Sequence, residues 1–342
     1  MNAAVRKAQA EFGAGPFADC FAASPGLAER RPLAIVCLMT FRRPAMLRAT
    51  LDSLVAQFEA PPFALVVVEN DAADPVGAAV ARDYFRTGRL DGLCVIEPAP
   101  GNCSAANRAF GEARRRFPSA EFVLMIDDDE IADPRWLVEI VGAARRTGAD
   151  IVGGPVVPRF PEGMAPALAE HPIYWPAYDR SGPVRQIYGS GNFLIRRDAY
   201  ARLANPDFDL AYNYLGGGDT DFFTRCRRAG MKFHWAQEAI IEETVPWARA
   251  ETRWVIQRGL RIGAINHRVD RVGASSRLGH AKVFAKTFAL PLVALFRTIR
   301  LMAAGKAPLV ALHPCFVAAG RFFGAFGFAP EQYRPVAQKT PA

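Results

Sequence analysis

One run in the sequence, Phe122-Val123-Leu124-Met125-Ile126-Asp127-Asp128-Asp129-Glu130, joins five apolar residues to four acidic ones. An unbroken apolar run of this length is typical of a strand that is buried on both faces. Clustered carboxylates at the end of such a strand are stabilised when they share a hard divalent cation with the phosphate oxygens of a ligand. The alternative is an acidic turn that caps the next helix, which Asp133-Pro134 could do alone.

Similar short apolar runs precede this one, and amphipathic segments separate them. We expect strands at residues 33–39, 64–68, 93–96 and 122–126, and helices at residues 44–57, 76–85, 104–117 and 134–146. Repeated alternation of this kind predicts an α/β fold with a mainly parallel sheet and flanking helices. Right-handed crossovers then bring the loops after the strands to one edge, where open α/β sheets bind ligands.

Polar residues follow the first two of these strands. Thr40 can offer a hydroxyl after the first strand, and Arg42 or Arg43 can offer a fork suited to a diphosphate. A plain helix start explains Thr40 equally well. After the second strand, Asn70-Asp71 can accept hydrogen bonds from a base or a ribose, or can form a simple turn.

A third acidic site lies further along, in Gly216-Gly217-Gly218-Asp219-Thr220-Asp221. Three glycines let a backbone pass close to a ligand or move as a gate. Asp219 would then start a helix and accept a proton from an acceptor hydroxyl, although a simple helix cap at Asp219 or Asp221 is the alternative. Before this site we expect a substrate-facing loop region at residues 159–183 and a strand at residues 191–195.

The charge of the chain is uneven. Its 342 residues include 42 Lys and Arg and 34 Asp and Glu, which gives a formal net charge of +8. Residues 271–330 contain eight of the basic residues and no acidic residue. A local basic and apolar C-terminal module is therefore expected, whereas a partner nucleic acid is not.

The C-terminal segments, the cysteines and the N-terminus indicate where the protein is located in the cell. A long basic helical region is expected at residues 246–269; the apolar segments after it, at 287–296 and 307–320, are too short to span a bilayer. Basic and apolar side chains together suit an anionic membrane surface, unless these helices pack on the catalytic domain or on a second subunit. Scattered cysteines and a charged N-terminus without a signal-peptide pattern predict a cytoplasmic protein, peripheral on the inner face of the cell membrane.

Other nucleotide and hydrolase motifs are missing. The sequence has no phosphate loop of the G-x-x-x-x-G-K-[ST] type, no G-x-G-x-x-G after the first strand and no G-x-S-x-G elbow. A nucleoside triphosphatase, a dinucleotide dehydrogenase and an α/β-hydrolase are therefore disfavoured.

The ordered motifs resemble those of the family 2 inverting glycosyltransferases, which have the nucleotide-diphospho-sugar transferase fold called GT-A. The resemblance extends over residues 33–263 and includes a subgroup similarity to bacterial exopolysaccharide glucosyltransferases of the succinoglycan type. It rests on Thr40-Phe41-Arg42-Arg43-Pro44, Val68-Glu69-Asn70-Asp71, Ile126-Asp127-Asp128-Asp129-Glu130 and Gly217-Gly218-Asp219-Thr220-Asp221.

The resemblance implies a role for each matching residue. Asp219 would be the catalytic base with Asp221 in support, and Asp129 would bind Mg²⁺ or Mn²⁺. Nucleotide binding is implied for Thr40, Arg43, Asp71, Asn107, Asp127 and Asp128. Acceptor binding or gating is implied for Gly217, Gly218 and Trp254.

Three departures from the family pattern matter. Gly217-Gly218-Asp219 replaces the frequent Gly-Glu-Asp, so the acid beside the base is missing. Ala105-Ala106-Asn107 replaces Ala-Arg-Asn and loses an arginine that could contact the nucleotide. Arg253-Trp254 lacks the glutamine of the Gln-x-x-Arg-Trp motif of processive relatives, which favours the addition of one sugar over polymer synthesis.

Together these features predict a metal-dependent, inverting, non-processive hexosyltransferase. It would move one sugar from a nucleotide-diphospho-sugar, a UDP-sugar first, to a saccharide acceptor that we expect to be lipid-linked, in bacterial exopolysaccharide or surface glycan synthesis. The alternatives are a nucleotidyltransferase of similar fold and a non-catalytic scaffold in polysaccharide assembly. The expected organisation is an N-terminal extension (1–31), a GT-A domain (32–265) with nucleotide-binding (32–130) and acceptor-binding (131–265) halves, and a helical membrane-associating module (266–342).

Overall fold

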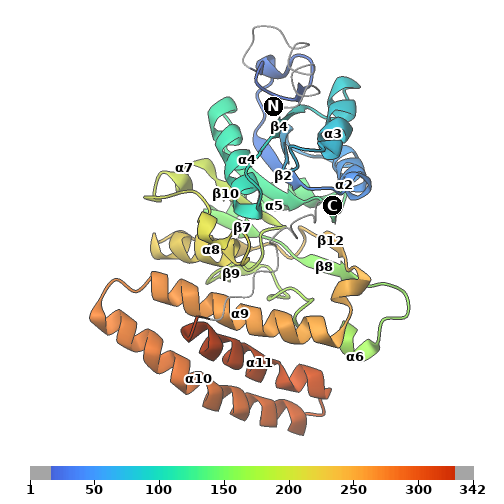
Figure 1. Cartoon of the computed structure of the whole chain (residues 1–342). Helices are drawn as coiled ribbons and strands as arrows, with labels where there is room; N and C mark the ends of the chain where they lie inside the picture. The colour runs from blue at the N-terminus through green and yellow to red at the C-terminus, as the bar shows by residue number, and fades with distance from the viewer. Residues whose placement is uncertain (1–16, 328–342) are drawn as a thin grey trace, which may run out of the picture. The chain divides into compact units, whose positions relative to one another are not determined.

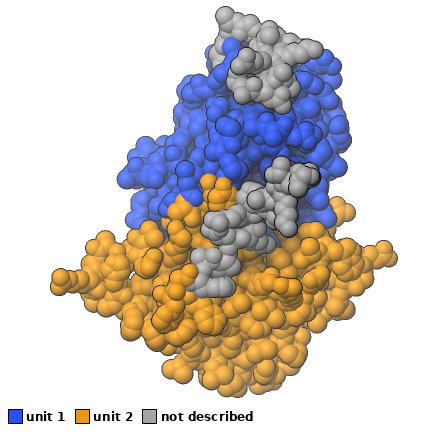
Figure 2. Space-filling model, viewed as in Figure 1, with its two compact units in different colours: residues 1–157, 176–210, 222–244 blue, residues 158–175, 211–221, 245–342 orange. Residues whose placement is uncertain are grey.

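The computed structural model describes residues 17–327 and divides the chain into two compact units. The first unit comprises residues 1–157, 176–210 and 222–244, and the second comprises residues 158–175, 211–221 and 245–342 (Figure 2). The first unit contains the large sheet, and the second contains the long C-terminal helices (Figure 1).

A nine-stranded sheet with the order β1-β4-β3-β2-β5-β10-β7-β11-β9 forms the centre of the first unit. Its strands are β1 (Ala22–Ala23), β2 (Ala34–Thr40), β3 (Phe63–Glu69), β4 (Gly92–Ile96), β5 (Phe122–Asp127), β7 (Ile151–Gly153), β9 (Gly182–Val184), β10 (Phe193–Arg196) and β11 (Phe233–Trp235). The neighbours β4, β3, β2 and β5 all pair in parallel, which confirms the predicted fold class. A small sheet has the order β6 (Glu130–Ala132), β12 (Ile241–Thr244), β8 (Val156–Arg159).

Helices cover both faces of the parallel strands. One core joins Val36 and Leu38 of β2 to side chains of α2 (Pro44–Val55), α3 (Val76–Arg86) and α5 (Trp136–Thr147). Because side chains alternate along a strand, Ile35 and Cys37 lie on the opposite face, where α4 (Asn102–Arg116) packs against β2 and β3.

Aromatic rings extend this second core. Phe110 of α4 stacks on Phe193 of β10 with ring centroids 5.9 Å apart, and Phe193 meets Phe223 edge-on at 5.0 Å. Phe208 stacks on Phe222 at 4.6 Å. β10, which carries Phe193, pairs antiparallel with β5, the last of the parallel strands.

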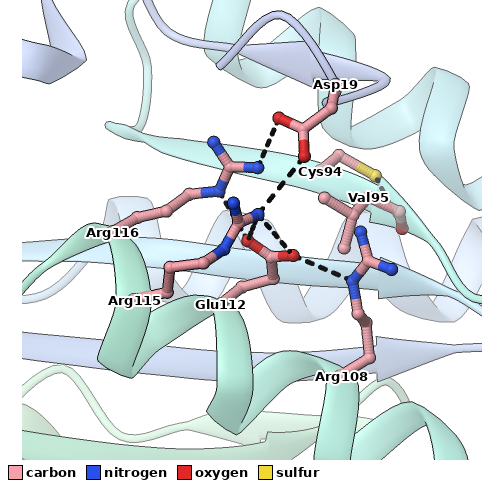
Figure 3. A network of polar contacts seen from close by, with 7 residues as sticks. All are labelled: Asp19, Cys94, Val95, Arg108, Glu112, Arg115 and Arg116. Atoms are coloured by element: carbon pink, nitrogen blue, oxygen red, sulfur yellow. Dashed lines mark hydrogen bonds and ion pairs between the residues drawn. The ribbon is translucent and has the colours of Figure 1, made fainter. Parts of the chain in front are cut away.

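The N-terminal segment closes one edge of the sheet. β1 pairs antiparallel with β4, so the edge of the parallel strands is covered. Asp19 just before it is ion-paired with Arg115 and Arg116 of α4, which also pair with the buried Glu112 (Figure 3). The described part of the expected N-terminal extension, residues 17–31, includes this edge strand.

Three long helices dominate the second unit. They are α9 (Thr252–Val272), α10 (Arg277–Ala303) and α11 (Pro308–Ala325). α11 packs along α9 and also against α10 (Figure 1). The α9–α11 crossing is close because it is lined by glycine: a Cβ at Gly263 would lie 2.0 Å from the Val317 carbonyl oxygen, and one at Gly320 would lie 1.9 Å from that of Leu260.

Two of these helices extend beyond the apolar segments named from the sequence. α10 continues through Pro291 and past both ends of the predicted segment 287–296. α11 extends beyond the predicted 307–320 and, within residues 17–327, is the one helix with the length and hydropathy to cross a membrane. A buried core helix meets the same criteria, and Arg321 of α11 is buried against Asp270 of α9 at 2.8 Å.

Candidate functional site

The polar residues of the first unit meet at the carboxyl edge of the sheet. β2 lies between β3 and β5 and runs parallel to both, with Thr40 opposite Glu69 and Met39 opposite Asp127. The three strands therefore end side by side. Thr40 ends β2, Asp127 ends β5, and Asp71 lies just beyond β3.

Hydrogen bonds join the acidic turn to the start of α2. The Thr40 hydroxyl donates to Asp128 Oδ2 at 2.8 Å. Arg43 Nη1 donates to Asp128 Oδ1 at 3.1 Å and to Asp129 Oδ2 at 2.7 Å. Arg43 stands immediately before Pro44, where α2 begins, so a single guanidinium pairs with two carboxylates from the neighbouring strand end.

Three residues that the sequence analysis did not assign to the site shape this turn. The Thr50 hydroxyl of α2 lies 3.1 Å from the Asp128 carbonyl oxygen and 2.7 Å from that of Glu130. Glu130 turns back, and its Oε2 accepts a hydrogen bond from the Asp127 N–H at 2.8 Å. Gly191 leaves the space for it, because a Cβ there would lie 1.9 Å from Glu130 Oε1. Only Glu130 gave a signal, as a member of the acidic run.

Two carboxyl groups of the turn, those of Asp127 and Glu130, have raised pKa values. Burial, and then the nearby charges of Asp129 and Asp128, raise the pKa of Asp127 to about 8. Burial and the charge of Asp127 raise the pKa of Glu130 well above its usual value. The charge of Glu243, which lies opposite Glu130 in the small sheet, also raises the pKa of both groups. A cation bound at the turn would therefore lower the free energy of the ionised cluster.

The donor set suits a hard divalent cation in its chemistry. Every candidate ligand is a carboxylate oxygen, as Mg²⁺ and Mn²⁺ prefer. Over residues 17–327 no group of three or more His, Cys, Asp or Glu side chains is arranged to hold a metal ion unaided. Magnesium is commonly held by one or two carboxylates together with substrate phosphates, and Asp127 and Asp129 fit that sharing.

Asp71 lies at the same edge, in a different environment. Its Oδ2 accepts from Arg42 Nε at 2.5 Å, and its Oδ1 accepts from the N–H groups of Ala73 and Asp74. Burial raises the pKa of Asp71, but Arg42 and the two N–H groups outweigh burial and hold it below its usual value. The sequence suggested Arg42 and Arg43 equally as ligands of a diphosphate. In the structure they have different partners, because Arg43 pairs with the acidic turn and Arg42 with Asp71.

Asn107 makes a different contact. Its Nδ2 donates to the Phe208 carbonyl oxygen at 2.8 Å, and its Oδ1 accepts from the Phe208 N–H at 2.7 Å. This reciprocal pair attaches α4 to the loop before α8 (Gly218–Arg228). The amide is therefore engaged by the backbone, unlike Thr40 and Arg43, which bond to the acids.

The second unit contains the glycine-rich site. Gly216 and Gly217 have φ values of 79° and 86°, which glycine adopts readily. A Cβ at Gly217 would lie 2.4 Å from Ile265 Cγ2 of α9. α8 begins at Gly218, so Asp219 and Asp221 fall in its first turn, with Asp221 buried and Asp219 half-buried.

Trp254 is part of an aromatic group in the same unit. It stacks on Tyr174 at 5.5 Å with the ring planes 13° apart, and the Tyr174 hydroxyl donates to the Arg249 carbonyl oxygen at 2.6 Å. Tyr174 also meets Phe160 edge-on. These contacts order part of the expected substrate-facing region 159–183, whose regular structure is limited to the short helix α6 (Pro166–Ala169) and the strand ends.

Comparison with known proteins gives a family. The model of glycosyl transferase family 2 matches residues 35–204. The succinoglycan biosynthesis protein ExoM of Rhizobium meliloti (strain 1021) is 33% identical over 236 residues, which cover 67% of this chain and 72% of ExoM. A glucosyl-dolichyl phosphate glucuronosyltransferase of Haloferax volcanii is 27% identical over 184 residues, covering 51% of this chain and 55% of that protein.

A solved structure agrees in fold. The mannosyltransferase PcManGT from Pyrobaculum calidifontis, in complex with GDP-Man and Mn²⁺, aligns with a TM-score of 0.56 and 19% identity over 89% of each chain. The first-unit sheet with its flanking helices is therefore a GT-A fold.

Proposed function

Because the chain belongs to glycosyl transferase family 2, we propose that it transfers one sugar from a nucleotide-diphospho-sugar, a UDP-sugar first, to a saccharide acceptor. The similarity to a succinoglycan biosynthesis protein supports a place in exopolysaccharide or surface glycan synthesis. The observation that carries the proposal is the pairing of Arg43 with Asp128 and Asp129 at the carboxyl edge. It places a guanidinium and clustered carboxylates where open α/β sheets bind ligands.

The first unit is assigned to the donor. Asp71 accepts hydrogen bonds from the base or ribose. Thr40 and Arg43 hold Asp128 in position, and Asp128 contacts the nucleotide together with Asp127. Both carboxylate contacts of Arg43 use Nη1, and the other N–H groups of its guanidinium donate to a diphosphate.

The cation is assigned to Asp129 and Asp127, as Mg²⁺ or Mn²⁺. When bound, the ion supplies positive charge that stabilises the departing nucleoside diphosphate. Without such a charge, burial of Asp127 beside Asp128 and Asp129 favours its protonated form, which supports the assignment.

The glycine-rich site of the second unit is assigned to the acceptor. Asp219 accepts the proton of the attacking sugar hydroxyl, Asp221 supports it from the same helix turn, and Gly217 and Gly218 let the backbone approach the acceptor. The hydroxyl oxygen forms the new glycosidic bond as the bond to the diphosphate breaks, so the anomeric carbon inverts. Trp254, stacked on Tyr174, provides a flat apolar wall for a sugar ring.

Domain roles and location complete the proposal. Residues 32–130 bind the nucleotide, residues 131–265 bind the acceptor, and residues 266–342 associate with the inner face of the cell membrane. A lipid-linked saccharide is the acceptor that suits this location. The missing glutamine before Arg253-Trp254 supports the transfer of a single sugar. Because Ala105-Ala106-Asn107 lacks the arginine of the family pattern, the nucleotide is bound without an arginine after β4.

Calorimetric titration and a transfer assay test the proposal together. UDP, GDP and dTDP are titrated with and without Mn²⁺ into the wild type, Asp129→Asn and Asp219→Asn. Asp83→Asn, at an exposed position of α3, is the matched control. We expect metal-dependent binding of one nucleotide that is lost in Asp129→Asn and kept in Asp219→Asn. Transfer should fall by at least about a hundredfold in both, the usual range for loss of a general base.

Other outcomes contradict parts of the proposal. Normal turnover by Asp219→Asn would remove Asp219 as the base. Release of pyrophosphate from a nucleoside triphosphate and a sugar phosphate would indicate a nucleotidyltransferase. Absence of nucleotide binding under every condition would favour a scaffold.

A further inference from the structure

On α10 small and polar side chains are buried, whereas large apolar side chains are exposed. The face that packs inside the second unit buries Thr287, Ala294 and Thr298. Both threonine hydroxyls are bonded there, Thr287 to the Val283 carbonyl oxygen and Thr298 to that of Ala311, each at 2.8 Å. The large apolar side chains lie on the outside, and a soluble helix normally shows the opposite arrangement.

The exposed apolar residues form a continuous stripe. Phe284, Phe288, Leu292, Leu295, Phe296 and Ile299 recur at spacings of three and four and therefore share one side of the helix. Leu292 is 73% exposed, Phe296 is 61% exposed and Phe284 is 65% exposed in the described chain. Side chains of this size rarely gather on a free surface, and such a patch marks an interaction site.

A row of basic residues borders the stripe. At 3.6 residues per turn, Lys282, Lys286, Arg297 and Arg300 fall together on one flank, between the stripe and the packed face. All four are exposed, although Lys286 pairs with Asp270 of α9. Neither α10 nor α11 contains an acidic residue.

We propose that α10 lies in the plane of an anionic lipid bilayer, with this stripe inserted among the acyl chains and the basic flank at the headgroups. A helix with one apolar face and Lys or Arg beside it binds a membrane interface in this way. Each Lys or Arg near an anionic surface adds to the attraction. α10 and α11 contain no acidic side chain that the anionic surface would repel.

Charge complementarity favours lipid over a second copy of the chain. If two α10 stripes met, the basic flanks of both copies would approach, with no acidic residue on α10 or α11 to pair with them. Anionic headgroups supply the missing charge.

Vesicle binding by the full-length protein tests the surface. Flotation is compared on neutral phosphatidylcholine vesicles and on vesicles with added phosphatidylglycerol, for wild type, Leu292→Ser/Phe296→Ser and Lys282→Gln/Arg297→Gln/Arg300→Gln. Phe58→Ser, which alters an exposed apolar residue of the first unit, and Arg86→Gln/Arg145→Gln/Arg180→Gln are the matched controls. The charge variant should bind anionic vesicles on the order of a hundredfold more weakly. The serine variant should lose at least about tenfold.

Insertion is tested separately from attraction. Phe296→Trp should show a blue-shifted emission on anionic vesicles that lipids brominated in the acyl chain quench, after subtraction of the wild-type signal from its five tryptophans. Phe58→Trp, with 58% of Phe58 exposed in the first unit, should show neither effect.

Three results would overturn the proposal. They are equal binding to neutral and anionic vesicles, wild-type binding by the serine variant, and a lipid-free dimer that Leu292→Ser/Phe296→Ser dissociates in equilibrium sedimentation. The proposal rests on the membrane role given to residues 266–342, but vesicles are tested without donor or acceptor. Its failure would therefore leave nucleotide binding and transfer to be judged on their own assays.

Discussion

At the scale of single residues, the acidic turn depends on side chains that carry no charge. Thr40 bonds to Asp128 through its hydroxyl, and Thr50 lies within hydrogen-bond distance of two carbonyl oxygens of the turn. Four consecutive acids repel one another, so the turn keeps its shape only where such neutral donors and Arg43 hold it.

Thr50→Val tests this support, because valine keeps the shape and removes the hydroxyl. Thr50 is fully buried, and its loss leaves carbonyl oxygens of the turn without that donor. The free energy of unfolding should fall by about 1–3 kcal/mol, the usual penalty for an unsatisfied buried polar group. Urea denaturation followed by circular dichroism measures the change.

A matched variant separates this effect from a general loss of threonine. The hydroxyl of Thr87 also bonds to a carbonyl oxygen, that of Asp83 at 2.7 Å, but Thr87 is exposed. Thr87→Val should change the free energy of unfolding by less than about 0.5 kcal/mol. Equal effects of the two substitutions would show that Thr50 does not hold the turn.

At the scale of elements, the α9–α11 contact depends on glycine. The spacing of four between Gly259 and Gly263, and between Gly320 and Gly324, brings two small surfaces together. Gly320→Ala would force its methyl group against the Leu260 backbone, which cannot move aside as a side chain does. We expect the free energy of unfolding to fall by about 3 kcal/mol or more.

Gly111→Ala in α4 is the control for that substitution. It also lies within a helix, but a Cβ there would meet no atom within 4 Å. Alanine should therefore raise the free energy of unfolding by up to about 1 kcal/mol through helix propensity alone. Thermal denaturation of both variants gives the comparison, and a neutral Gly320→Ala would contradict close packing at the crossing.

A buried carboxyl group links β3 to α3. Glu69 Oε2 accepts from the N–H groups of Gly77 and Ala78 at the start of α3, and Oε1 accepts from that of Asp71. Burial raises the pKa of Glu69 to about 7, although the three N–H groups act in the opposite direction. In the unfolded chain the pKa should return to the ordinary value of 4.5.

The free energy of unfolding should therefore depend on pH through Glu69. Between about pH 4.5 and 7 the folded chain binds this proton and the unfolded chain releases it, so stability is greatest below pH 4.5 and falls as pH rises through 7. Glu69→Gln should flatten this part of the profile, measured as urea midpoints across that range. An unchanged slope would show that Glu69 titrates normally.

Much of the sheet could be predicted because its strands are long apolar runs. The run 33–39 became β2 and the run 122–126 became β5, each within a residue at its ends. β7, β9 and β11 have three residues each, too few for a pattern, and their positions depend on pairing with distant strands. Within α10 only the apolar segment 287–296 was named from the sequence, because Lys286 and Arg297 bound that segment.

Part of the candidate site could likewise be predicted from the sequence, and part could not. Asp127, Asp128 and Asp129 follow from their place after an apolar run, since a strand end fixes where they lie. The partners Arg43, Thr50 and Gly191 come from other elements, and only folding brings them to the turn. The role of Asp219 stays a prediction.

At the scale of the whole molecule, charge and composition separate along the chain. The formal net charge is +8, and residues 271–330 alone contribute eight basic residues without an acid. That segment includes α10 and α11 of the second unit, whereas the GT-A sheet belongs to the first. The catalytic fold and the basic surface thus come from different parts of one sequence.

The strand order of the large sheet also bears on how the chain behaves once its backbone is cut. β10 lies between β5 and β7, although it follows both in sequence. A nick after the exposed Arg180 by trypsin would leave β1 to β7 on one fragment and β9 to β11 on the other, with β10 interleaved between strands of its partner. The fragments should co-elute in gel filtration under native conditions and separate only in denaturant. Independent elution would contradict the interleaved order; co-elution would make this loop a site for split-protein complementation, with each half silent until the other restores the sheet.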